Sequence, residues 1–193
     1  MQRCGWVSQE PLYIAYHDSE WGVPQTDGKK LFEMICLEGQ QAGLSWITVL
    51  KKRENYRRSF HNFDPVRVAA MQDADVERLM QDAGIIRHRG KIQAIIANAR
   101  AYLEMESNGE PFATFVWSFV DHQPIVRHAA TLGDVPVSTP ISDALAKALK
   151  KRGFKFVGTT ICYSFMQACG LVNDHITGCF CHPGGQHDPR LAQ

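Results

Sequence analysis

One short stretch combines a carboxylate with two glycines, a leucine and a tryptophan: Glu38-Gly39-Gln40-Gln41-Ala42-Gly43-Leu44-Ser45-Trp46. Glu38 follows Leu31, Met34 and Ile35 at the spacing i, i+3, i+4, i+7, so a helix begun at Asp27 places all four on one face. Burying an ionised acid is costly unless a polar group compensates it, so we expect Glu38 to serve a partner. The alternative, a tight turn whose glutamate pairs with an arginine, fits these nine residues equally well.

The second half of this stretch predicts a turn followed by a helix. Ser45 can cap a helix that runs to about Phe60 and carries Trp46. Gly43 allows the backbone to turn tightly ahead of that cap, which pushes Leu44 outward.

Composition limits the class of protein. The chain has 193 residues, 45% of them hydrophobic, enough for one domain or two closely packed lobes. No run approaches the roughly eighteen apolar residues of a membrane span. The N-terminus, with Glu10 and Asp18, lacks a signal-peptide pattern, so we expect an intracellular, cytoplasmic protein. The net charge of +1 does not decide for or against a nucleic-acid partner, because a local patch attracts phosphates.

The six cysteines favour metal binding or burial over disulfides, because their spacing is irregular and a chain of this size needs no covalent staples. Cys36, Cys162 and Cys169 lie in apolar runs and are expected to be buried. Near the C-terminus, three residues separate a histidine from a cysteine. With an N-terminal pair they could form a closed tetrahedral zinc site: Cys4, His17, His175 and Cys179. By spacing alone, Cys181, His182 and His187 compete as ligands, and free thiols are the commoner explanation.

The N-terminal arm, residues 1–26, is rich in aromatic residues. Prolines at positions 11 and 24 are expected to keep regular structure short, which predicts an irregular segment. Near an acid, its rings could line a pocket for a flat ligand, although each could equally pack a loop onto the domain. The rings are Trp6, Tyr13, Tyr16 and Trp21.

Further along, the sequence predicts helices only. Asp64-Pro65 marks a helix start, Asp73 and Asp75 open a short helix ending near Gly84, and 112–120 forms a buried helix. No convincing strand pattern occurs, so the expected fold is all-α with eight to ten helices.

Two segments could grip DNA phosphates. The cluster Arg87, Arg89 and Lys91 precedes a long helix, whose N-terminus favours anions, although a solvated loop is as probable. Helices over 142–152 and 159–170 flank a glycine-containing turn, with Thr159 or Thr160 as possible caps and lysines nearby. A plain packing unit is the alternative there. The expected phosphate contacts of this hairpin are Gly153, Lys155, Val157, Gly158 and Thr159.

Together, these motifs resemble the 3-methyladenine DNA glycosylase I family over residues 1 to about 183. The resemblance rests on Cys4-Gly5-Trp6, Tyr16-His17-Asp18, Glu20-Trp21-Gly22-Val23-Pro24, the stretch 38–46, Arg87-His88-Arg89-Gly90-Lys91 and Lys155-Phe156-Val157-Gly158-Thr159-Thr160. It implies a helix-hairpin-helix fold and a hydrolase that removes N3-methyladenine from alkylated double-stranded DNA and releases the free base. It also implies a structural zinc ion on Cys4, His17, His175 and Cys179.

The resemblance maps a base pocket onto Tyr16, Glu38 and Trp46, with Trp6, Tyr13 and Trp21 around it. Glu38 would favour the charged, methylated base over neutral adenine. We expect Leu44, with Gln41 and Gly43, to fill the space that the flipped base leaves in the DNA. Asp174 and Lys155 are not expected to be catalytic.

The expected organisation is a single catalytic unit over 1–183 that acts as a monomer. It would comprise a helical domain at about 27–170 and a zinc-clipped lobe of 1–26 and 171–183, followed by a flexible tail, 184–193. A zinc-stapled DNA-binding module without activity and a small-molecule zinc hydrolase are the rival hypotheses.

Overall fold

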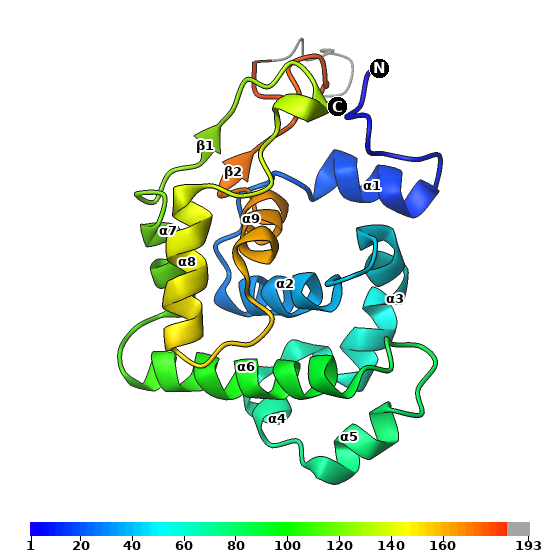
Figure 1. Cartoon of the computed structure of the whole chain (residues 1–193), viewed down its shortest axis with the longest axis vertical. Coiled ribbons are helices and arrows are strands. Elements are labelled where there is room, and N and C mark those ends of the chain that lie inside the picture. Colours follow the sequence, from blue (N-terminus) through cyan, green and yellow to red (C-terminus); the bar gives the residue numbers. More distant parts are fainter. Residues whose placement is uncertain (185–193) are drawn as a thin grey trace.

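The computed structural model describes residues 1–184, and these form a mainly helical protein (Figure 1). Two 3-10 turns, η1 (His61–Phe63) and η2 (Leu132–Asp134), and two short strands, β1 (Ile125–Val126) and β2 (Val172–Asn173), complete it. The α-helices of the described chain are α1 (Pro11–Ser19), α2 (Gly28–Gln40), α3 (Trp46–Ser59), α4 (Pro65–Ala69), α5 (Asp73–Leu79), α6 (Arg89–Ser107), α7 (Phe112–Ser118), α8 (Pro140–Lys151) and α9 (Thr159–Ala168).

Helix α2 lies at the centre of the molecule, between α9 and α6 (Figure 1). Its apolar side chains, among them Leu31, Phe32 and Ile35, are fully buried. Glu38 lies on the same face, as its spacing predicted. The helix that carries the acid is therefore held on several sides, which fixes the position of the carboxylate.

Four predicted helix starts are confirmed, but the capping interaction differs from the prediction at two of them. Asp27 and Asp64 accept hydrogen bonds from backbone amides of the first helical turns that follow them. Ser45 occupies the cap position of α3, but its hydroxyl bonds to the Thr48 hydroxyl instead. Helix α9 is capped by Gly158, and the Thr159 hydroxyl donates to Asp143.

The N-terminal arm was predicted to be irregular, and this prediction is wrong, because helix α1 occupies nine of its residues. Pro11 stands at the first position of that helix, where its missing N–H and fixed φ suit helix initiation. Tyr13, Tyr16 and His17 consequently project from consecutive turns of one helix.

The all-α prediction is also corrected in one detail, a two-residue parallel pairing of β1 with β2. Strands of two residues are too short to show an alternating pattern in the sequence. The pairing ties the loop after α7 to the segment after α9 (Figure 1). No helix within residues 1–184 is both long and apolar enough to cross a membrane. Apart from its first residue, the predicted tail lies outside the described residues, as does His187.

Candidate active site

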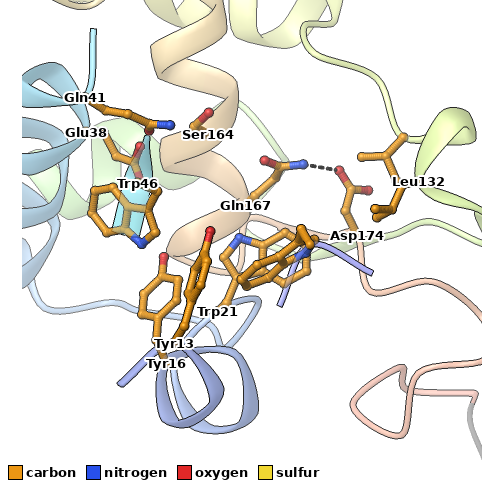
Figure 2. Close-up of a pocket in the computed structure, with 12 residues that line it drawn as sticks. Tyr13, Tyr16, Trp21, Glu38, Gln41, Trp46, Leu132, Ser164, Gln167 and Asp174 are labelled. Atoms are coloured by element: carbon orange, nitrogen blue, oxygen red, sulfur yellow. Dashed lines mark hydrogen bonds between the residues drawn. The ribbon is translucent and has the colours of Figure 1, made fainter. Parts of the chain in front are cut away.

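A cavity of about 180 Å³ opens between α1, α2 and α9, and it gathers all six predicted pocket residues (Figure 2). Six of its twelve lining residues were predicted as pocket residues, Gln41 was predicted for the DNA wedge instead, and five were missed. The predicted pocket residues are Trp6, Tyr13, Tyr16, Trp21, Glu38 and Trp46, and the missed residues are Leu132, Val135, Ser164, Gln167 and Asp174.

Glu38 is buried in the cavity wall without a compensating partner. Only 3% of the residue is exposed, and its Oε2 atom has no hydrogen-bond partner among the described residues. No arginine or lysine of residues 1–184 forms an ion pair with it, so the predicted alternative of an arginine-locked glutamate does not hold in this part of the chain. Burial raises the pKa of the Glu38 carboxyl to about 8.

Aromatic rings surround this carboxyl. The ring centroids of Tyr16 and Trp46 are 5.6 Å apart, and Trp6 lies 5.0 Å from both Tyr13 and Trp21. Figure 2 shows Trp46 between Glu38 and the two tyrosines. Burial, followed by the charge of Glu38, raises the pKa of Tyr16 well above its usual value, so its hydroxyl stays protonated. The buried Nε1 of Trp46 lacks a partner within the described chain.

The opposite wall was missed by the sequence reasoning. Ser164 and Gln167 lie on α9, and Asp174 follows it (Figure 2). Asp174 is 1% exposed and accepts hydrogen bonds from Tyr163 and, at 2.9 Å, from Gln167. The available signal for this wall was the pair Ser164 and Gln167, two polar residues at i and i+3 within the mostly apolar second half of the helix.

The predicted metal ligands meet beside the pocket. Cys4, His17, His175 and Cys179 are buried, and their ligand atoms lie within 4.8 Å of one another. Cys4 Sγ and Cys179 Sγ each lie 3.5 Å from His175 Nδ1, and Cys179 Sγ lies 3.5 Å from His17 Nε2. A second, partly overlapping group of possible ligands contains His17, Asp18 and Cys181.

The turn between α2 and α3 has the predicted shape. Gly43 adopts a φ of +77°, which side chains other than glycine rarely tolerate, and the following Leu44 is 42% exposed. Gln41 from the same turn lines the cavity. The exposed leucine therefore stands next to the pocket.

The basic cluster differs from the prediction. Arg87 and Arg89 are exposed, and Arg89 pairs with Glu77. Lys91, in contrast, is 5% exposed, and its Nζ donates to the carbonyls of Gln40 and Ala42, so it is not available to a phosphate.

In the hairpin between α8 and α9, only some of the predicted phosphate contacts are accessible. Gly158 caps α9, leaving the amides of its first turn outside the helical ladder, and the side chain of Lys155 is exposed. The backbone of Lys155, however, is bound on both sides by Asn98 of α6, and Val157 is buried. Gly153 has a φ of +94°, as a tight turn requires.

The hairpin packs directly behind Glu38, and Gly39 makes this possible. A Cβ atom at position 39 would lie 3.2 Å from the Cβ and from the carbonyl oxygen of Phe156. We expect Gly39→Ala to lower the free energy of unfolding by about 1–3 kcal/mol, because the hairpin must shift off α2. Thermal unfolding measures the effect. Gly133→Ala, whose Cβ would meet only ordinary contacts, is the control, and equal melting temperatures for both variants would contradict the close-packing explanation.

The structure is a mainly helical protein with an open cavity that combines aromatic rings with a buried acid. Residues 6–182 match the sequence model of the methyladenine glycosylase family. The chain belongs to this family, so the resemblance drawn from its motifs is confirmed.

Relatives support the assignment over the full length. The chain is 81% identical to DNA-3-methyladenine glycosylase 1 of Escherichia coli (strain K12), over 96% of this chain and 100% of the relative. A crystal structure of 3-methyladenine DNA glycosylase I superimposes with a TM-score of 0.94 at 82% identity, over 94% of this chain and 100% of that one. A Staphylococcus aureus structure, which concerns 3-methyladenine recognition, matches with a TM-score of 0.92 at 39% identity, over 95% of this chain and 97% of that one.

Proposed function

We infer that the protein is a DNA glycosylase that hydrolyses the N-glycosidic bond of N3-methyladenine in alkylated DNA. The family and the E. coli relative, which is 81% identical, support this activity. The observation that carries it is Glu38, a buried carboxyl group with an unpartnered oxygen in an aromatic cavity. Such a group is costly unless a ligand pairs with it, and a cationic base is that ligand.

The proposed mechanism begins with the base leaving the helix. Extrusion costs a few kcal/mol, and less for a damaged base. The methylated ring then stacks against Tyr16 and Trp46, where a cation gains about 0.5–2 kcal/mol on an electron-rich face. Glu38 accepts hydrogen bonds from the adenine edge as a carboxylate. Neutral adenine offers less compensation for that buried charge, which makes Glu38 the selective element.

Bond cleavage then needs little activation. Methylation at N3 gives the base a positive charge, so the bond between the sugar C1′ and the base nitrogen breaks with its electron pair moving to the base. The base leaves as neutral 3-methyladenine. Water forms the new C1′–O bond and loses a proton to solvent. The protein thus contributes mainly selection, orientation and electrostatic support.

DNA contacts surround the cavity in this proposal. Leu44, supported by Gln41 and Gly43, fills the gap in the base stack. The amides of the α9 N-terminus after Gly158 and the ammonium of Lys155 face phosphates, whereas the Thr159 hydroxyl is engaged by Asp143. Arg87 and Arg89 extend the basic surface.

A structural zinc ion fits the cluster of Cys4, His17, His175 and Cys179. A Zn–S distance of about 2.3 Å and a Zn–N distance of about 2.05 Å at tetrahedral angles place sulfur and nitrogen ligands about 3.6 Å apart. The three sulfur–nitrogen distances of 3.5 Å agree with this value. The other ring nitrogen of each histidine is hydrogen-bonded: His17 to the carboxylate of Asp18, and His175 to the carbonyl of Trp21. These bonds orient the two rings. Four protein ligands leave no open position, so the ion would hold residues 1–26 to residues 171–183 without entering the chemistry.

Base release tests the function directly. The protein is incubated with double-stranded DNA treated with a methylating agent, and free bases are identified by mass spectrometry. We expect 3-methyladenine to be released with a great preference over unmodified adenine, without strand cleavage by the protein. Binding to DNA without base release would favour the rival, a non-enzymatic zinc-stapled DNA-binding module. All pocket residues come from one chain, so a monomer in the cytoplasm, where the DNA lies, is expected to suffice.

A further inference from the structure

We propose that Lys91 is a positioning residue that holds the turn of residues 40–44, and thereby Leu44, in the shape needed to enter the DNA. This inference rests on the proposed role of Leu44. It assigns to the basic cluster before α6 a function other than phosphate binding.

The ammonium of Lys91 is bound at the end of α2. Its Nζ lies 2.8 Å from the carbonyl oxygen of Gln40 and 2.6 Å from that of Ala42. The last carbonyls of a helix have no partner within the helix, and they form the negative end of its dipole. A cation at this point therefore satisfies both carbonyls and crosslinks the turn to the start of α6.

The attachment is reciprocal and extends into the core. The Gln40 side-chain amide donates to the carbonyl of Lys91 at 3.1 Å, and its side-chain oxygen accepts from the Tyr56 hydroxyl at 3.1 Å. The Tyr56 hydroxyl in turn accepts from the amide of Ile86 at 3.1 Å. The side chain of Gln40 is thus tied to α6 through Lys91 and to α3 through Tyr56.

A lysine is an expensive choice for this position. The residue is 5% exposed, and within residues 1–184 no carboxylate forms an ion pair with it. An apolar residue would avoid the cost of burying the charge, but it would leave both carbonyls without this donor. The choice of lysine is explained if holding these carbonyls in a fixed geometry is needed for the position of Leu44.

The turn itself cannot maintain that geometry. Gly43 has open space around it, with no atom within 4 Å of a hypothetical Cβ, and glycine is the least restricted residue. Leu44 is anchored from within the turn by one hydrogen bond, from its amide to the carbonyl of Gln41. Lys91 supplies an external anchor at Ala42, immediately before Gly43.

The test is a double-mutant cycle with Lys91→Met and Leu44→Ala, which measures single-turnover release of 3-methyladenine from methylated duplex DNA. We expect Lys91→Met to slow release by 10- to 100-fold, on the order of what misplacement by about 1 Å costs. In the Leu44→Ala background, it should add less than about twofold, because the two residues act as one unit. The affinity for free 3-methyladenine, followed by tryptophan fluorescence, should stay within about twofold.

Lys52→Met is the control, since Lys52 also donates to a backbone carbonyl but lies outside the proposed site. It should leave the rate unchanged. Lys91→Arg, which keeps the charge and the donors, is expected to restore most of the rate and to serve if Lys91→Met does not fold.

Each contrary result has a distinct meaning. If Lys91→Met slows release by the same factor with and without Leu44, Lys91 does not position Leu44. The same holds if Lys91→Met lowers the affinity for free 3-methyladenine by as much as it slows release. If Leu44→Ala alone leaves release unchanged, the proposed role of Leu44 fails, and the inference on Lys91 fails with it, while base excision stands.

Discussion

Glu38→Gln is expected to slow the release of 3-methyladenine by on the order of 100-fold or more, the usual effect of removing a preorganised electrostatic group. Glutamine has nearly the same shape, so the cavity should remain intact. It cannot carry the negative charge that pairs with the methylated base. Single-turnover release from methylated DNA measures the loss, and a rate equal to that of the unmodified protein would remove Glu38 from the mechanism.

The same carboxyl predicts a pH dependence of activity. Burial raises the pKa of Glu38 to about 8, so in most molecules of the free protein the Glu38 carboxyl is protonated at neutral pH. If the carboxylate is the active form, kcat/KM should rise with pH and level off above about 8, because this constant reports groups of the free protein. Glu38→Gln should abolish this rise. Measuring kcat/KM from pH 6 to pH 9 distinguishes the two profiles.

Stability should change in the opposite direction. The carboxyl titrates at a pKa of about 8 when folded and 4.5 in the reference state, so between these values the unfolded chain binds fewer protons. The free energy of unfolding therefore falls by up to about 1.4 kcal/mol per pH unit as the pH rises.

Glu38→Gln lacks this titration and should be the more stable protein at pH 8, by at most roughly 5 kcal/mol, with the difference vanishing near pH 4.5. Glu104→Gln, at an exposed acid, is the control and should show no such trend. A site that lowers stability in exchange for ligand recognition is a common feature of active sites. A pH-independent difference would contradict the unpaired, buried state of Glu38.

Local patterns explain which parts of this fold were predictable. The apolar stripe that contains Glu38 is a matter of helical spacing, and the exposure of Leu44 follows from the glycine before it. These features depend on neighbours in sequence. The four side chains of the candidate metal site could be named because thiols and imidazoles are scarce, and because the family resemblance selected among competing ligands.

Features that depend on distant contacts were not predictable. Lys91 looked like a surface cation because its sequence neighbours are basic, whereas a turn 49 residues earlier in the chain determines its burial. Asp174 joins the cavity through the approach of the segment after α9 to α1 and α2. Pro11 was predicted to interrupt regular structure, but it begins α1. The same ring, which fixes φ and removes the N–H, disfavours proline inside a helix and suits it to the first position.

Loss of the metal cluster should give the second large effect, through folding. We expect Cys179→Ser to lose the proposed zinc ion and to lower the melting temperature by at least about 10 °C, because the site forms only in the folded chain and metal binding therefore adds to the folding free energy. Metal content by elemental analysis and thermal unfolding measure both effects. A chelator should lower the melting temperature of the unmodified protein in the same way.

Cys181→Ser is the matched control. Cys181 lies two residues away and is partly exposed, but it is not among the four mutually close, buried ligands. It should retain one zinc ion per chain and an unchanged melting temperature. If Cys181→Ser instead loses the metal, the ion is held by the second group, which contains His17 and Asp18.

The effect on chemistry should be smaller than the effect on folding. His17 and His175 contact Trp6 and Trp21 of the cavity wall, with ring centroids 5.2 Å and 4.7 Å apart, so the cluster supports the pocket from behind. It contributes no open coordination position to the reaction. Well below its melting temperature, Cys179→Ser should therefore release 3-methyladenine within about tenfold of the normal rate, since only the supporting wall is loosened. A well-folded, metal-free Cys179→Ser protein of unchanged stability would show that residues 1–26 and 171–183 are held together by packing alone.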